Sequence, residues 1–237
     1  MKIENMNLLH FKNEPYQNYE NYIYDLLDAE GADIVDTMLS NKSNAYGAKS
    51  TGEHIEQRHI EMTEKDMVHM ALKTGQIQGI FAMGYDNPMV RDDFKDMIYG
   101  ALWENAEKMA QQFVDYRMPF QKTFNYNTSE FIGYGINKDF NLVKADSIGI
   151  VFRLSDDPFS KLGIEIETVY PIITENGEII KNKDALKKEY NIDDRDLIKF
   201  KTKQHFRDNI KEIKGRIKEE RSRKAEDRDF KPSEFNR

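Results

Sequence analysis

The sequence predicts an α+β fold in which helices come first and a small antiparallel sheet follows. Apolar residues recur at helical spacing over residues 16–39 and again over residues 89–116. From about residue 120 the pattern changes to short segments that alternate apolar and polar residues, and turn-forming residues separate these segments. Helices followed by strands, rather than helices and strands in alternation, indicate an α+β domain and not a parallel α/β sheet.

Each helix follows from a local signal. Gly31 interrupts the first helical segment, residues 16–39, so two shorter helices are an equal alternative. The Ser-, Asn- and Gly-rich stretch that follows predicts a linker with a boundary near Lys49. Thr63 and Asp66 form a capping box that opens a helix, and Gly75 stops it. The long helix over residues 89–116 has its apolar face at Phe94, Met97, Ile98, Ala101, Leu102, Asn105, Met109 and Phe113.

Four strands are expected at residues 120–126, 130–137, 147–154 and 163–173, with the last two joined as a hairpin. A period of two sends alternate residues of a strand to one face. On the last strand that face carries Ile164, Ile166, Thr168 and Tyr170, so a hydroxyl and a phenol stand where core residues are expected. Residues 175–178 predict a turn, and Ile179 and Ile180 a short strand.

Charge is spread unevenly along the 237 residues. The net charge of −7 divides into −4 for residues 1–50, −9 for residues 51–180 and +6 for residues 181–237. The basic tail is a charged, amphipathic helical segment that packs on the domain or on a partner and frays after about Arg221. It can supply an attraction for phosphates that the acidic middle of the chain lacks.

Composition excludes several classes of site. The chain has no cysteine, which removes disulfides and thiolate metal sites, and no apolar run long enough to span a membrane. No Gly-rich phosphate loop and no GxSxG motif is present, and the first residues do not form a standard secretory signal.

The residues that carry chemistry begin with Gly52 to His59, GEHIEQRH. Histidine suits acid–base work near neutral pH because its ordinary pKa lies there. In an α-helix His54 and Arg58 lie one turn apart, whereas His59 lies about 140° away from His54. The two histidines can therefore share a phosphate only if the segment bends or ends between them. Taken alone, a histidine at a helix start is more often a cap or a surface residue.

Five segments in order resemble the RNase A-like toxin domain of bacterial polymorphic toxins, including some contact-dependent inhibition toxins. The resemblance covers roughly residues 49–173, about half of the chain. It starts with the motif GxHxx[ERQ][KR]H. The matching residues are Gly52, His54, Arg58 and His59; Phe81 ahead of a helix through Trp103 and Asn105; Ile132 to Gly135 (IGYG); Ile150 to Pro158 (IVFRLSDDP); and Thr168 to Pro171 (TVYP).

The resemblance implies a metal-independent ribonuclease that needs no cofactor and cleaves RNA through its own 2'-hydroxyl. His59 is then the principal acid–base residue and His54 the second candidate, while Thr168 and Tyr170 donate hydrogen bonds to the phosphate. It implies RNA, including tRNA, as substrate, a dedicated immunity protein as partner, and a cytoplasmic site of action reached without a standard signal peptide. The chain then divides into a helical extension (1–48), an RNase A-like domain (49–180) and a basic helical tail (181–237).

Two residues depart from the family pattern. Met70 stands where members carry a basic residue on the following helix, and His69, Lys73 or Arg58 could supply that charge instead. Ile60-Glu61 replaces the glycine that usually follows the second histidine, which puts a carboxylate near the phosphate site. These departures and the acidic domain keep an alternative open: a non-catalytic interaction or structural protein of a phage or mobile element that retains the fold.

Overall fold

The computed structural model describes residues 16–41, 50–82, 88–114, 123–128, 131–155 and 161–229. Outside these residues lie the first residues, most of the expected linker with its boundary near Lys49, the start of the strand expected from residue 120, and the residues 156–158 of the expected hairpin loop.

The described chain is α+β, as the sequence predicts, but its strands form two antiparallel sheets rather than one. One has three strands in the order β2-β5-β6 and the other has four in the order β1-β3-β4-β7. The strands are β1 (Gln78–Phe81), β2 (Thr123–Asn127), β3 (Gly133–Ile136), β4 (Leu142–Ala145), β5 (Ser147–Leu154), β6 (Ile164–Pro171) and β7 (Ile179–Lys181). The sequence analysis did not predict β1 and β4.

The helices are α1 (Tyr16–Ser40), α2 (Thr51–Ile55), the π-helical segment η2 (Glu56–Ile60), α3 (Glu64–Thr74), α4 (Pro88–Glu104), α5 (Ala106–Val114), α6 (Lys183–Tyr190) and α7 (Asp194–Asp229). The capping prediction for α3 is confirmed. The Thr63 hydroxyl accepts a hydrogen bond from the Asp66 amide, and Gly75 ends the helix in the left-handed conformation.

Two helical predictions need correction or refinement. The backbone of α1 is non-helical at Glu30, beside Gly31, where the ring of Tyr99 occupies the space that a Cβ would need. The helix expected over residues 89–116 is two helices separated at Asn105, whose side-chain amide donates to the Ala101 carbonyl at 2.8 Å. The helix α7 is described as far as Asp229, and the fraying expected after about Arg221 stays a prediction.

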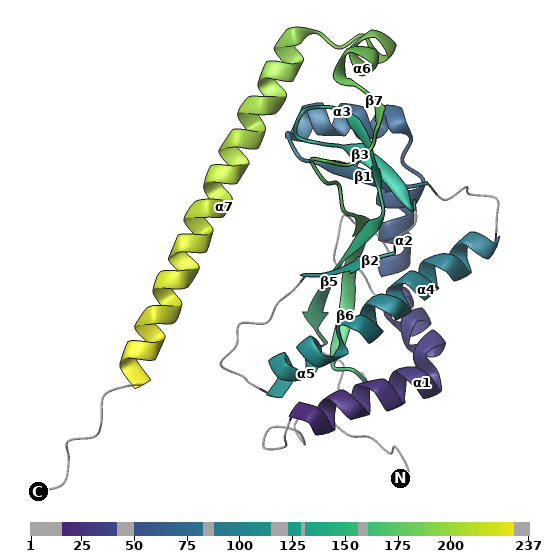
Figure 1. Cartoon of the computed structure of the whole chain (residues 1–237), viewed down its shortest axis with the longest axis vertical. Helices are drawn as coiled ribbons and strands as arrows, with labels where there is room; N and C mark the ends of the chain where they lie inside the picture. The colour runs from purple at the N-terminus through teal and green to yellow at the C-terminus, as the bar shows by residue number, and fades with distance from the viewer. Residues whose placement is uncertain are drawn as a thin grey trace, which may run out of the picture.

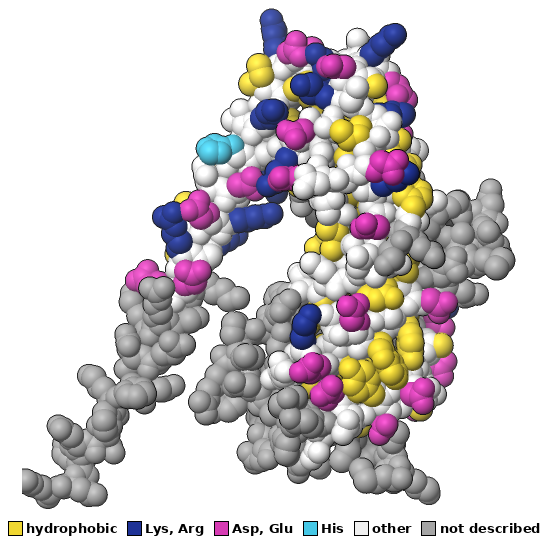
Figure 2. All heavy atoms as spheres, viewed as in Figure 1, with side chains coloured by type: hydrophobic (Ala, Val, Ile, Leu, Met, Phe, Trp, Pro, Cys, Tyr) yellow, Lys and Arg dark blue, Asp and Glu magenta, His cyan; other side chains and the backbone are white. Residues whose placement is uncertain are grey.

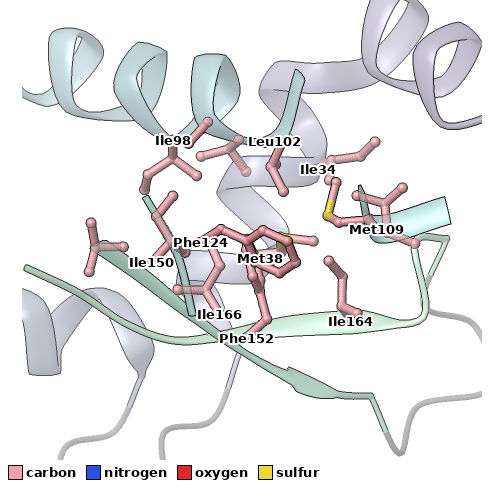
Figure 3. Close-up of a cluster of buried hydrophobic side chains, with 14 of the residues drawn as sticks. Ile34, Met38, Ile98, Leu102, Met109, Phe124, Ile150, Phe152, Ile164 and Ile166 are labelled. Atoms are coloured by element: carbon pink, nitrogen blue, oxygen red, sulfur yellow. The ribbon is translucent and has the colours of Figure 1, made fainter. Parts of the chain in front are cut away.

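Two apolar cores correspond to the two sheets. The three-stranded sheet packs against α1, α4 and α5, and Figure 3 shows the side chains that meet there. The labelled ones are Ile34, Met38, Ile98, Leu102, Met109, Phe124, Ile150, Phe152, Ile164 and Ile166, all buried except for a few per cent. The four-stranded sheet packs against α3, α6 and the first turns of α7, where Phe140 and Phe200 meet edge to face.

The helix α1 therefore belongs to the same core as the three-stranded sheet, and α6 with the start of α7 belongs to the other. Figure 1 shows the two sheets one above the other, with α7 leaving the upper end and running down beside the body. The division at residues 48 and 180 stays a prediction.

Candidate active site

A π-helical turn brings the two histidines of the GEHIEQRH segment together. Ser50 caps α2 by accepting a hydrogen bond from the Glu53 amide at 3.1 Å, and the chain then widens into η2. A π-turn bonds residue i to i+5, so two side chains five positions apart lie near each other instead of on different sides. His54 and His59 have this spacing, and their ring centroids lie 6.2 Å apart. The bend that the sequence analysis required between them is this turn.

His59 is held by the strand β1. Its Nδ1 lies 3.1 Å from the carbonyl oxygen of Gly79. A carbonyl oxygen only accepts, so Nδ1 carries the proton and Nε2 is the basic nitrogen. The pKa of His59 is lowered to about 4. Burial is the largest cause, the hydrogen bond to Gly79 opposes it, and the charges of His54 and Arg58 add to the lowering. The imidazole is therefore neutral at pH 7 and can accept a proton.

His54 is the more enclosed of the two rings, with 5% of its surface exposed. Burial lowers its pKa most, the charge of Arg58 lowers it further, and Glu167 raises it. The helix α2 is fixed to the last strand of the three-stranded sheet, because the Thr51 hydroxyl donates to the Ile166 carbonyl at 3.0 Å. This bond ties the histidine segment to the strand that carries Thr168 and Tyr170.

A β-bulge places Thr168 and Tyr170 on the site. Val151 pairs with Thr168 and Phe152 with Ile166, so Glu167 is an extra residue on β6. The extra residue reverses the alternation. Before the bulge Ile164 and Ile166 face the core, whereas after it Val169 does and Thr168 and Tyr170 face away. The prediction that all four residues share one face was wrong, because the bulge separates the two polar residues from the core.

The Tyr170 ring lies over a glycine. Gly149 pairs with Tyr170 across the sheet, and a Cβ at Gly149 would lie 2.7 Å from the ring atom Cζ. The ring is thereby placed 6.3 Å from the His59 ring, centroid to centroid. Burial raises the pKa of the Tyr170 phenol, so it stays protonated and can donate a hydrogen bond.

All five predicted site residues, His54, Arg58, His59, Thr168 and Tyr170, line one cleft of about 880 Å³. Residues that the sequence analysis had not assigned to the site complete it. From the body these include Gln76, Asn125 and Lys138, and from α7 they are Gln204, Arg207, Asp208 and Lys211. In the space-filling view a hollow separates α7 from the body below the point where they meet (Figure 2).

The α7 wall is held by the C-terminal end of α3. Lys203 donates to the carbonyl oxygens of Leu72 and Lys73, and Arg207 donates to that of Thr74 at 2.9 Å. These carbonyls are the ones that a helix end leaves without partners, so cations are favourable there. The tail thus becomes a wall of the cleft through contacts that the sequence does not reveal.

The cleft is basic although the protein is acidic. Its described lining contains five Lys or Arg side chains and one carboxylate, Asp208. Lys138 is also paired with Glu175 at 2.9 Å, outside the lining. Two polar atoms in the lining, Thr168 Oγ1 and Gln204 Nε2, are buried and have no hydrogen-bond partner among the described residues. Cations and unused donors in one hollow suit a ligand rich in anionic oxygens.

The structure also shows what surrounds Met70. Its sulfur lies 3.9 Å from Nη1 of Arg58, which donates toward it, and Lys73 lies on the same wall. Of the three residues considered as replacements for the missing cation, Arg58 and Lys73 line the cleft and His69 does not. Glu61 is exposed and is not part of the lining.

Within the described ranges, no group of three or more His, Asp or Glu side chains is arranged to hold a metal ion. The same residues include no helix with the length and apolar character needed to cross a bilayer.

Comparisons with known proteins do not identify a family for this chain. No family model matches the chain, and no curated protein matches it. A solved structure that does match is the CdiA-CT/CdiI complex from Y. kristensenii 33638, with a TM-score of 0.40 and 18% sequence identity. The match covers 51% of this chain and 99% of the other. At this level of similarity it assigns neither an activity nor a site residue.

Proposed function

We propose that the protein is a metal-independent, toxin-like ribonuclease that cleaves RNA by transesterification in the cleft between the body and α7. The observation that carries the proposal is the meeting of His54 and His59 with Thr168 and Tyr170 in one basic cleft. The two pairs are far apart in the sequence and reach the site through unrelated devices, a π-turn and a β-bulge.

His59 is the general base in this mechanism. Its Nδ1–H is held by the Gly79 carbonyl, so Nε2 takes the proton of the ribose 2'-hydroxyl, whose oxygen attacks the neighbouring phosphorus. The bond from phosphorus to the 5'-oxygen breaks, and that oxygen leaves with a proton from a general acid. His54 is the candidate, acting in its protonated form, which its lowered pKa makes the minor form at pH 7. The products are a 2',3'-cyclic phosphate and a free 5'-hydroxyl.

Thr168, Tyr170 and Arg58 stabilise the charge on the phosphorane. The Tyr170 phenol and the Thr168 hydroxyl are donors in the lining, and Thr168 Oγ1 has no partner among the described residues. Arg58 adds a guanidinium on the histidine side. Donors and cations fixed where charge develops are often the largest contribution to catalysis of such reactions.

Lys73, Arg207 and Lys211 attract the polynucleotide. The chain as a whole would repel RNA, so the local charge of the cleft must supply the attraction. We further propose that the RNA includes tRNA, that the site of action is a cytoplasm, and that an immunity protein neutralises the activity.

The test is cleavage of total RNA and tRNA by the purified full-length chain in EDTA. We expect His59→Ala to lower the rate by about 10²–10⁴-fold and Tyr170→Phe by about 10–10²-fold. His205→Ala and Tyr134→Phe are matched controls outside the cleft and should cleave like the wild type. If the wild type is inert at high concentration, the proposal fails and the alternative of a non-catalytic interaction protein takes its place.

A further inference from the structure

A line of exposed apolar side chains runs along α7, starting level with the cleft. Phe206, Ile213 and Ile217 are 65%, 55% and 45% exposed, and the half-buried Ile210 lies between them. Their spacing of four, three and four is that of the a and d positions of a heptad repeat, which places them on one side of a helix. We call these four residues the α7 stripe. It is a different face from the one that Leu197 and Phe200 bury against the body.

The side chains that flank the α7 stripe are basic. In a heptad with Phe206 and Ile213 at d, the flanking e and g positions through Arg216 are Arg207, Asn209, Lys214 and Arg216. Three of these four are cations and none is an anion, although Arg216 also pairs with Glu212 one turn earlier and Arg207 donates to the Thr74 carbonyl. Figure 2 shows Lys and Arg side chains projecting from both sides of the described part of α7.

This pattern selects among possible occupants. A second copy of α7 would bring its own e and g cations against these, and like charges at these positions oppose pairing. A polynucleotide would use the cations and could stack a base on Phe206, but it would gain little from the three isoleucines, which offer neither a stacking face nor hydrogen bonds to phosphate or base edges. A protein helix or groove with an apolar centre and a rim of Asp and Glu satisfies both features.

We infer that the α7 stripe is the docking site of an acidic protein partner, which buries Phe206, Ile213 and Ile217 and pairs its carboxylates with the flanking cations. This inference stands independently of the ribonuclease activity. The partner is placed beside the cleft, because Arg207 belongs both to the flank of the stripe and to the cleft lining.

The test uses two synthetic helical peptides of three heptads with isoleucine and leucine at a and d. One carries Glu at e and g, and the other carries Lys there. Binding to the fluorescently labelled full-length chain is followed by anisotropy at two salt concentrations. We expect the Glu peptide to bind at least about tenfold more tightly than the Lys peptide, with a preference that shrinks as salt rises.

Three variants make the test specific. Replacing Phe206, Ile213 and Ile217 by Ser should lower the affinity for the Glu peptide by about 100-fold or more. Ile198→Ser is the matched control, because Ile198 is 64% exposed on the same helix but lies outside the stripe. This variant should bind the Glu peptide as tightly as the wild type does. Lys214→Glu with Arg216→Glu should reverse the preference between the peptides.

Equal affinity for both peptides, or binding that survives the triple Ser variant, would overturn the inference. So would concentration-dependent dimerisation of the wild type in sedimentation equilibrium that the triple variant abolishes, because the occupant would then be a second copy.

Discussion

Replacing His59 by Asn should remove a large part of the acid sensitivity of the fold. The Asn Nδ2–H2 group can take the place of the imidazole Nδ1–H and keep the hydrogen bond to the Gly79 carbonyl, but it does not titrate. In the wild type the folded protein holds the pKa of His59 at about 4, against 6.5 for an ordinary histidine. Between those two pH values the unfolded chain binds a proton at this histidine and the folded chain does not.

Proton linkage gives the direction and the magnitude of the change in unfolding free energy with pH. Because the folded pKa is lowered, the stabilisation is fully present above pH 6.5 and falls as the pH drops toward 4. A difference of about 2.5 pH units corresponds to at most about 3 kcal/mol of unfolding free energy. The partial exposure of His59 at the cleft wall makes this an upper value.

The assay is urea unfolding of the wild type and His59→Asn at intervals from pH 7.5 to pH 4. Carboxylates and His54 titrate in both proteins, so their contributions largely cancel in the difference between the two curves. We expect the wild type to lose about 2–3 kcal/mol relative to the variant as the pH falls. Parallel curves for the wild type and His59→Asn would refute the reasoning.

Three further predictions concern activity. Because His59 is neutral at pH 7, kcat/KM should persist below pH 6.5 and its acid limb should lie near 4; an acid limb at 6.5 or above would contradict the assigned protonation. Gly149→Ala should displace the Tyr170 ring and lower the cleavage rate about as much as Tyr170→Phe. Gly215→Ala, where a Cβ has open space, should leave activity unchanged and stabilise α7 by about 1 kcal/mol. Lys73→Ala with Lys211→Ala should lower the affinity for a 2'-O-methylated RNA and reduce the slope of log affinity against log salt by about 1.4; an unchanged slope would remove these lysines from the RNA path.

The sequence predicted an element correctly where the interactions that start and end the element lie within a few residues of one another. The helix α3 is the clearest case, because the Thr63 cap and the left-handed Gly75 make their hydrogen bonds to residues of that same helix. The break at Asn105 is different. Its side-chain amide also lies 3.5 Å from the Asn125 carbonyl on β2, a partner that helical periodicity cannot reveal.

The sequence predicted which residues belong to the candidate site, but not the backbone features that bring them together. His54, His59, Thr168 and Tyr170 come from motifs in the sequence, whereas the π-turn and the bulge at Glu167 depend on packing between α2, η2 and the strands. The α7 wall was missed for the same reason, because Gln204, Arg207 and Lys211 reach the cleft through the end of α3. The one signal in the sequence was the +6 charge of residues 181–237.

The most direct test of the ribonuclease account is cleavage of a DNA oligonucleotide that contains a single ribonucleotide, in EDTA, with analysis of the new ends. The account predicts one cut, directly after the ribonucleotide, that leaves a 2',3'-cyclic phosphate and a 5'-hydroxyl. The same oligonucleotide with a 2'-O-methyl group at that position should remain intact. Cleavage of the methylated oligonucleotide, or ends that carry a 5'-phosphate, would show that the 2'-hydroxyl is not the nucleophile and would contradict the roles given to His59 and Tyr170.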